Sequence, residues 1–250
     1  MTIITMPAML AVLGSVVGSF LATLVIRWPA DRSVVRGRSQ CDHCGTALAA
    51  RDLVPLFSAA LARGRCRHCG GSIDARHWQI ELGAAAIGLV AAVAVPGPVA
   101  LAGAVFGWLL LALATLDVSE FWLPDRLTGT LALGGLVTGL IGIYPPLTDR
   151  LIGGGAGFAG LWLVGQGYQL LRHREGLGGG DPKLLGAIGL WVGWQMLPVI
   201  LLLASLTGFA LIFVRAVGVR TARMDDRVPL GALLAIAAYP AWLFLLGSAA

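Results

Sequence analysis

The chain has 250 residues, of which 57% are hydrophobic and only 12% are charged, and its mean hydropathy is +0.83. Soluble globular domains carry roughly 25% charged residues, so this composition excludes an ordinary soluble protein and indicates a polytopic membrane protein. The net charge of +5 does not indicate nucleic-acid binding, because the basic residues flank apolar segments instead of covering a polar, aromatic-rich face. The 35 glycines fit close helix packing in lipid, and the cluster at 153–157 is interpreted as a helix contact and not as a phosphate loop.

Eight apolar runs of spanning or near-spanning length follow one another along the chain. Lipid offers the backbone no hydrogen-bond partners, so each run is expected to be a helix, and the predicted fold is all-α with about eight transmembrane helices. The first run is followed by Arg27 and is interpreted as an anchor and not as a cleavable signal peptide. The sixth run is short for a span of about 20 residues and could be tilted, half-inserted or continuous with the next helix. The runs cover residues 6–26, 79–95, 99–116, 127–144, 151–171, 183–195, 197–214 and 229–247.

The basic residues are distributed unequally between the two sides of this arrangement. Eight crossings put both termini on one side, and of the 18 lysines and arginines all but Arg150 fall on the other side. The positive-inside rule therefore places the polar insertion 27–78 in the cytoplasm and both termini outside. The predicted organisation is a first transmembrane helix (1–26), a cytoplasmic zinc module (27–78) and a helical membrane domain (79–250).

The insertion holds all four cysteines, in the motifs CDHCG (41–45) and CRHCG (66–70). Two such pairs are typical of a tetrahedral zinc site, and the glycine after each pair permits the tight turn beneath the thiolates. Disulfides or free thiols are the alternative, and a reducing cytoplasm disfavours disulfides. Four thiolates leave no open position, so we expect a structural zinc, with His43 and His68 as surface residues. The predicted ligands are Cys41, Cys44, Cys66 and Cys69.

Two aspartates mark the cytoplasmic edge of predicted spans. Asp117 ends the run 99–116, and Asp181 precedes the sixth run behind three glycines. Ionisable groups at the edge of hydrocarbon are costly and indicate a functional site. Two close carboxylates share one proton, so one can activate water while the other polarises a peptide carbonyl. The pattern predicts an aspartyl protease pair, with Gly178 and Gly180 letting the substrate backbone approach Asp181.

Structural roles for these carboxylates stay open at this point. Asp181 could cap a helix that starts at Pro182, and Asp117 could be a solvated helix end. Asp125 is expected to cap the helix of the fourth run, and Glu120 is expected to be solvated.

Four segments in this order resemble the prepilin peptidases, bacterial inner-membrane aspartyl proteases that process type IV pilins and type II secretion pseudopilins. GSFLATLVIRWP (18–29) resembles the amino-terminal signature of that family, and CDHCG…RGRCRHCG resembles its cytoplasmic zinc module. LDVSEFWLPDRLT (116–128) and GLGGGDPKLLGAIGLWVGW (176–194) resemble the two catalytic segments. The resemblance covers nearly the whole chain and implies Asp117 and Asp181 as the catalytic residues.

The resemblance also implies a substrate and a second activity. The implied substrates are prepilins or pseudopilins, cut after a glycine at the cytoplasmic face of the inner membrane, and the implied surroundings are membrane lipid without nucleic acid. The zinc module implies the bifunctional form, which methylates the new amino terminus with S-adenosylmethionine; no sequence pattern assigns the residues that bind this methyl donor. Between the cysteine pairs the chain keeps Asp52 and Pro55 but has Leu53 and Ala59 where the family often has asparagine and tryptophan.

Two other functions fit the residues taken alone. A proton-coupled transporter also uses paired membrane carboxylates, but it would place them near the midplane and not at the cytoplasmic edge. A non-enzymatic pilus or secretion assembly scaffold could use the zinc module as a docking platform. Such a scaffold would tolerate the loss of Asp117 or Asp181.

Overall fold

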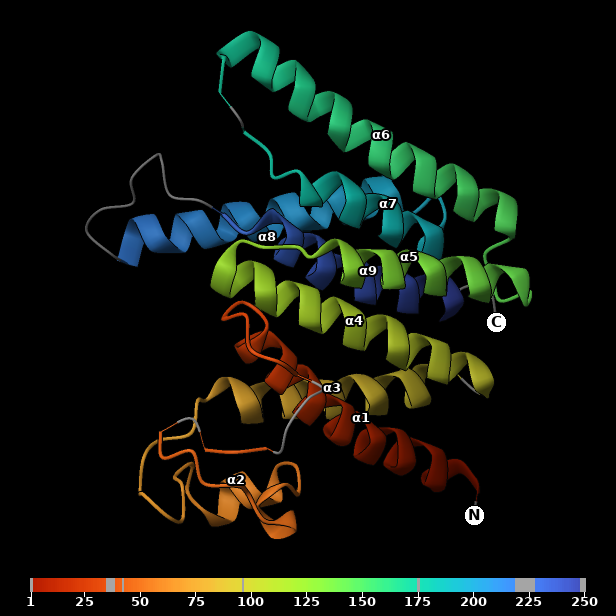
Figure 1. Ribbon diagram of the computed structural model, residues 1–250. Coiled ribbons are helices and arrows are strands. Elements are labelled where there is room, and N and C mark those ends of the chain that lie inside the picture. The colour runs from red at the N-terminus through yellow and green to blue at the C-terminus, as the bar shows by residue number, and fades with distance from the viewer. Residues whose placement is uncertain are drawn as a thin grey trace. The chain divides into compact units, whose positions relative to one another are not determined.

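A computed structural model describes residues 2–34, 39–41, 43–95, 97–174, 176–218 and 228–247 (Figure 1). The described residues form nine α-helices and no β-strand, apart from two isolated bridges in the cysteine motifs. Five of the helices, α1, α3, α4, α8 and α9, are long and apolar enough to cross a membrane. The predicted all-α, multi-pass membrane fold is therefore confirmed, whereas the number of eight crossings stays a prediction. The helices outside the polar insertion are α1 (Thr2–Arg27), α3 (Arg76–Ala94), α4 (Pro98–Glu120), α5 (Asp125–Leu140), α6 (Leu147–Arg172), α7 (Gly180–Val192), α8 (Leu197–Gly218) and α9 (Leu230–Gly247).

Each of the apolar runs corresponds to one of these helices, but several boundaries differ from the expected ones. Helix α4 continues to Glu120, so Asp117 lies in its last turn instead of ending it. Helix α5 ends at Leu140, earlier than expected, and Gly142 follows with a φ of 81° that no helix continues through. Helix α7 is not continuous with α8, because Gly193 follows it with a φ of 75°.

The chain divides into two compact units, residues 1–112 and 113–250, with the boundary inside α4. The division into 1–26, 27–78 and 79–250 stays a prediction. In the first unit α1 packs against α3 (Figure 1). Small residues line this contact: a Cβ at Gly18 would lie 2.7 Å from the Cα of Glu81, and a Cβ at Gly14 would collide with the Ala84 carbonyl. The two backbones can approach closely because these positions lack side chains, as is usual for helices in membranes.

Helix α7 is the centre of the second unit. It packs against α5, α6 and α9 (Figure 1), and ten of its 13 residues are buried. On α6, a Cβ at Gly153 would lie 2.6 Å from the Gly189 carbonyl, and one at Gly157 would lie 2.7 Å from the Leu185 carbonyl. The expected helix contact of the 153–157 cluster is therefore confirmed at these two glycines.

Arg150 of α6 ties three segments of the second unit together. Its side chain is completely buried, and its guanidinium donates to the α7 carbonyl of Leu190 at 2.8 Å and to the α5 carbonyl of Gly135 at 3.0 Å. All its other hydrogen bonds go to the end of α5 and the connection that follows. These acceptors are Thr138 Oγ1 and the carbonyls of Ile143, Tyr144 and Pro145.

Candidate active site and metal centre

Asp117 lies in the last turn of α4 and is only 5% exposed. Its Oδ2 accepts a hydrogen bond of 2.8 Å from the backbone N–H of Ala232, in the first turn of α9. The first N–H groups of a helix have no partners within the helix and carry a partial positive charge. The amino terminus of α9 therefore holds the Asp117 carboxylate in place and stabilises its negative charge.

Asp181 lies in the first turn of α7 and is 7% exposed. Its Oδ2 accepts a hydrogen bond of 3.1 Å from the N–H of Gly178, just before the helix. The expectation that Asp181 caps a helix starting at Pro182 is wrong, because α7 already starts at Gly180 and Gly179 is its N-cap. Like Asp117, Asp181 places a negative charge at the positive end of a helix.

The two aspartates face one neighbourhood within the second unit. Leu123, in the connection between α4 and α5, links their surroundings: a Cβ at Gly180 would lie 2.8 Å from Leu123 Cβ, and one at Gly231 would lie 2.7 Å from Leu123 Cδ1. The same Cβ at Gly231 would lie 3.0 Å from Asp117 Oδ2. The structure thus brings together the two carboxylates that the sequence singled out.

The glycines before Asp181 have a local role in this geometry. A Cβ at Gly178 would lie 3.0 Å from Asp181 Oδ2, and at Gly180 it would overlap Leu123. The absence of side chains at these two positions leaves room for the Asp181 carboxylate and for Leu123. The expected approach of a substrate along Gly178 and Gly180 stays a prediction.

The other two carboxylates of this region lie at the surface. Glu120 is exposed, as expected. Asp125 does not cap α5, since Pro124 occupies the N-cap position and no side chain bonds to the free N–H groups there. Instead Asp125 forms an ion pair of 2.7 Å with Lys183 of α7. Asp125 therefore bonds to a residue that is distant in sequence and not to the backbone of its own helix.

The four cysteines form no disulfide and lie in one cluster in the first unit. Their sulfur atoms all lie within 4.8 Å of one another, and Cys41 Sγ is 3.9 Å from Cys69 Sγ. A disulfide requires about 2.05 Å. A tetrahedral ion with Zn–S bonds of about 2.3 Å requires sulfur atoms about 3.8 Å apart. The arrangement is therefore that of a four-thiolate metal site.

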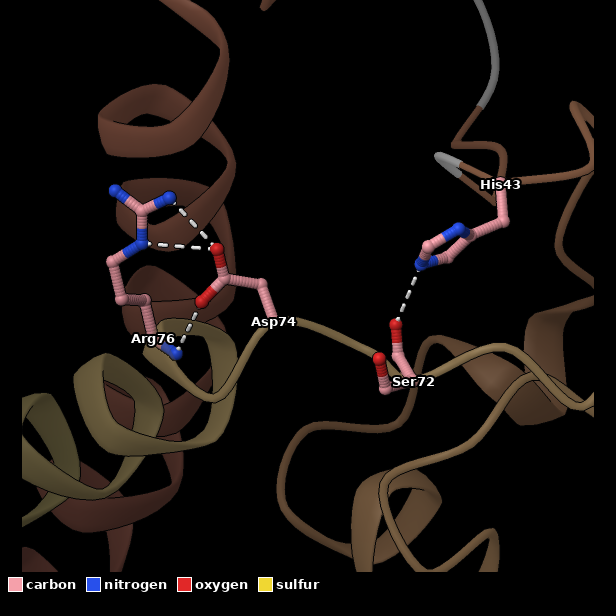
Figure 2. Close-up of polar contacts among 4 residues, drawn as sticks. All are labelled: His43, Ser72, Asp74 and Arg76. Carbon is pink, nitrogen blue, oxygen red and sulfur yellow. Dashed lines mark hydrogen bonds and ion pairs between the residues drawn. The ribbon is translucent and has the colours of Figure 1, made fainter.

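The two cysteine motifs fold alike. In each, the N–H of the glycine donates to the first cysteine's carbonyl at 2.9 Å, and Gly45 and Gly70 have φ values of 69° and 71°. The predicted tight turns beneath the thiolates are confirmed. His43 and His68 are exposed, as expected, and His43 Nε2 lies 3.1 Å from the Ser72 carbonyl, which joins the two motifs (Figure 2).

Hydrogen bonds lower the pKa of two of the four thiols, Cys44 and Cys66, whereas the pKa of the Cys69 thiol is raised. The hydrogen bond to the Thr46 hydroxyl lowers the pKa of the Cys44 thiol to about 6. Backbone N–H groups of Cys69 and His68 lower the pKa of Cys66. A lower pKa favours the thiolate, which is the form that binds metal.

Two buried charged residues were not identified as important from the sequence. Glu81 of α3 is 6% exposed and lies in the first unit, and Arg150 entered only the count of basic residues. Glu81 carries the signal used for Asp181, since it is a carboxylate near the edge of an apolar run. The buried role of Arg150 had no comparable signal, because its acceptors are backbone carbonyls.

Comparisons with known proteins cover both units of the chain. The Bacterial Peptidase A24 N-terminal domain matches residues 12–95, and the Type IV leader peptidase family matches residues 104–213. The Prepilin leader peptidase/N-methyltransferase of Aeromonas salmonicida (strain A449) is 41% identical over 83% of this chain and 71% of its own length. The proteins of that name from Burkholderia pseudomallei (strain 1026b) and Pseudomonas putida are 39% and 35% identical, over 90% and 93% of this chain and 81% and 88% of their own lengths. No solved structure matches the chain. The chain belongs to the type IV leader peptidase family.

Proposed function

We propose that this protein is a membrane aspartyl endopeptidase that removes the leader peptide from type IV prepilins or pseudopilins and then N-methylates the new amino terminus. The observation that carries the peptidase assignment is the pair of buried carboxylates, Asp117 and Asp181, held by the amino-terminal turns of α9 and α7. Nothing in their surroundings neutralises them as a structural ion pair would, since neither has a cationic partner among the described residues.

In the proposed cleavage Asp117 and Asp181 share the acid and base roles. The ionised carboxylate takes a proton from a water molecule, whose oxygen then bonds to the carbonyl carbon of the scissile peptide. The protonated carboxylic acid gives its proton to the carbonyl oxygen, so the tetrahedral intermediate is neutral. When the C–N bond breaks, the leaving nitrogen receives the proton that the first carboxylate holds, and one hydroxyl of the intermediate returns its proton to the second carboxylate. The leader leaves with a new carboxyl terminus, and the pilin keeps a free amino terminus.

In the proposed methylation that amino terminus is the nucleophile. Its nitrogen lone pair bonds to the methyl carbon of S-adenosylmethionine, the C–S bond breaks, and the electron pair stays on sulfur, which becomes a neutral thioether. The amine releases one proton to solvent. The names of the similar proteins from three organisms, each an N-methyltransferase, support this second activity.

We further infer that Cys41, Cys44, Cys66 and Cys69 hold a structural Zn²⁺. The sulfur distances and the tetrahedral preference of zinc support this assignment. Four thiolates leave no position for a reacting water, so the ion would order the insertion and take no part in cleavage. The excess of arginines in the insertion supports its cytoplasmic location, and with it cleavage at the cytoplasmic face of the inner membrane.

The test is to incubate the purified protein with a prepilin and isotopically labelled S-adenosylmethionine, and to analyse the product by mass spectrometry. The expected product has lost its leader and carries one labelled methyl group on its new amino terminus. A scaffold or a transporter would leave the prepilin uncut, and that result would refute the proposal.

A further inference from the structure

A cavity of about 540 Å³ lies within the first unit. It is lined by the last turns of α1, the first turns of α3 and both cysteine motifs. Sites for small molecules commonly have volumes of about 300–1,000 Å³ and combine apolar walls with a few polar groups. The proposed cleavage step makes no use of this cavity.

Two of the three carboxylates that line the cavity are neutralised by arginine. Asp52 pairs with Arg67 at 3.3 Å. Asp74 pairs with the Arg76 guanidinium at 2.7 Å and also accepts the Arg76 backbone N–H at 2.9 Å (Figure 2). Neither carboxylate needs a further cation.

Glu81 is the third carboxylate, and it differs from the other two. It is 6% exposed, and its Oε2 accepts a hydrogen bond of 2.8 Å from the N–H of Leu56. In the part of the chain that the structure describes, no lysine or arginine pairs with it. A buried carboxylate without a cation is costly, so a positively charged ligand in the cavity would relieve that cost.

The remaining lining fits one ligand of the proposed reaction. Ile26, Leu53 and Ile73 give the cavity apolar surface against which a nucleoside can lie. Several arginines also line the cavity, among them Arg27 and Arg65, and they offer positive groups for a carboxylate. S-Adenosylmethionine combines these parts: a nucleoside, a carboxylate, and a methionine portion that carries a sulfonium and an ammonium.

We propose that this cavity binds the methyl donor, with the Glu81 carboxylate facing the positive charges of its methionine portion. This inference rests on the proposed methyltransferase activity. It also explains the role of the metal site. Cys41 and Cys66 line the same cavity, so a bound zinc would stabilise that part of its wall.

The test measures binding and not turnover. Equilibrium dialysis of radiolabelled S-adenosylmethionine against the purified, zinc-loaded full chain should give a Kd that rises at least ten-fold in Glu81→Gln. Glutamine keeps an oxygen for the Leu56 N–H, so the local fold is retained. The matched control is Glu120→Gln, which removes one negative charge from the exposed end of α4 and should leave the Kd unchanged.

A second variant blocks the cavity by volume. Thr23 of α1 lines the cavity, so Thr23→Trp should abolish binding of both S-adenosylmethionine and its product S-adenosylhomocysteine. Prepilin cleavage and zinc content, measured on the same samples, show whether each variant is folded. If Thr23→Trp misfolds, the Kd of the Glu81→Gln variant alone decides whether the donor binds in this cavity.

The outcomes separate this inference from the proposed function. Donor binding by the wild type with an unchanged Kd in Glu81→Gln would overturn the proposed location while leaving the methyltransferase assignment intact. Unchanged binding in a folded Thr23→Trp variant would do the same. A wild type that cleaves prepilin but neither binds nor uses the donor would overturn the methyltransferase assignment, and this inference with it.

Discussion

Replacing either Asp117 or Asp181 with asparagine should abolish leader removal while the protein stays folded. Asparagine keeps the shape of the side chain and one oxygen, so it can still accept the Ala232 N–H at position 117 and the Gly178 N–H at position 181. It cannot take a proton from water or donate an acidic one. The substitution therefore removes the chemistry and leaves the packing in place.

The substitution should lower the rate of cleavage much more than it lowers the stability of the fold. Loss of general acid–base help lowers the rate by about 10²–10⁴-fold, which corresponds to about 3–5 kcal/mol in the barrier. When two residues act as one catalytic unit, removing either of them lowers the rate by more than this. The change in stability is smaller, because exchanging a charged acceptor for a neutral one in a single hydrogen bond costs about 1 kcal/mol. Unfolding therefore cannot account for the expected loss of activity.

The assay is the initial rate of prepilin cleavage, measured at equal amounts of purified variants in the same detergent. Asp125→Asn is the matched control from the same region: its side chain is 72% exposed and pairs only with Lys183. A surface ion pair of this kind is worth up to about 1 kcal/mol, so this control should cleave like the wild type. Cleavage within ten-fold of the wild-type rate by Asp117→Asn or Asp181→Asn would refute the aspartyl-protease mechanism.

Four further predictions test other parts of the structure. Mass spectrometry of the metal should find about one zinc per chain, and Cys66→Ser should lower this content; full occupancy after removal of every cysteine would exclude the site. A reporter fused after Ala250, which lies outside the described residues, should be active only if it works in the periplasm, and a cytoplasmic signal would mean a wrong helix count. Gly231→Ala should slow cleavage with little loss of protein, because the added Cβ would lie 3.0 Å from Asp117 Oδ2, and a normal rate would contradict this contact. Arg150→Met should lower the free energy of unfolding in detergent by at least about 3 kcal/mol, since it leaves buried carbonyls without donors, and an unchanged denaturation midpoint would contradict that role.

The helices and the aspartate pair could be predicted from the sequence because each depends on the bilayer. Apolar runs must form helices in lipid, so run length alone identifies the elements. Asp117 and Asp181 both lie where such a run meets a polar segment on the same predicted side, so they were expected to meet. The partner of Asp117 could not be predicted in this way. Ala232 lies 115 residues away, and only tertiary packing brings the first turn of α9 to Asp117.

The errors at individual carboxylates have different causes. Asp125 was expected to cap its own helix, and it pairs instead with Lys183 of α7. Asp181 was expected to be an N-cap, and it lies within the first turn instead. Glu81 was overlooked although the rule applied to Asp181 covers it too, because no second carboxylate suggested a chemical role for it.

Helix α7 shows why the buried charges of the second unit belong together. Its 13 residues span about 20 Å, well short of the 30 Å hydrocarbon core, so at least one of its ends must be satisfied inside the protein. Asp181 places negative charge at the positive amino end, and Arg150 donates to the Leu190 carbonyl near the negative carboxyl end. Both charges complement the helix dipole. Arg150 therefore fixes one end of α7 against α5 and α6, and Asp181 lies at the other end of the same short helix.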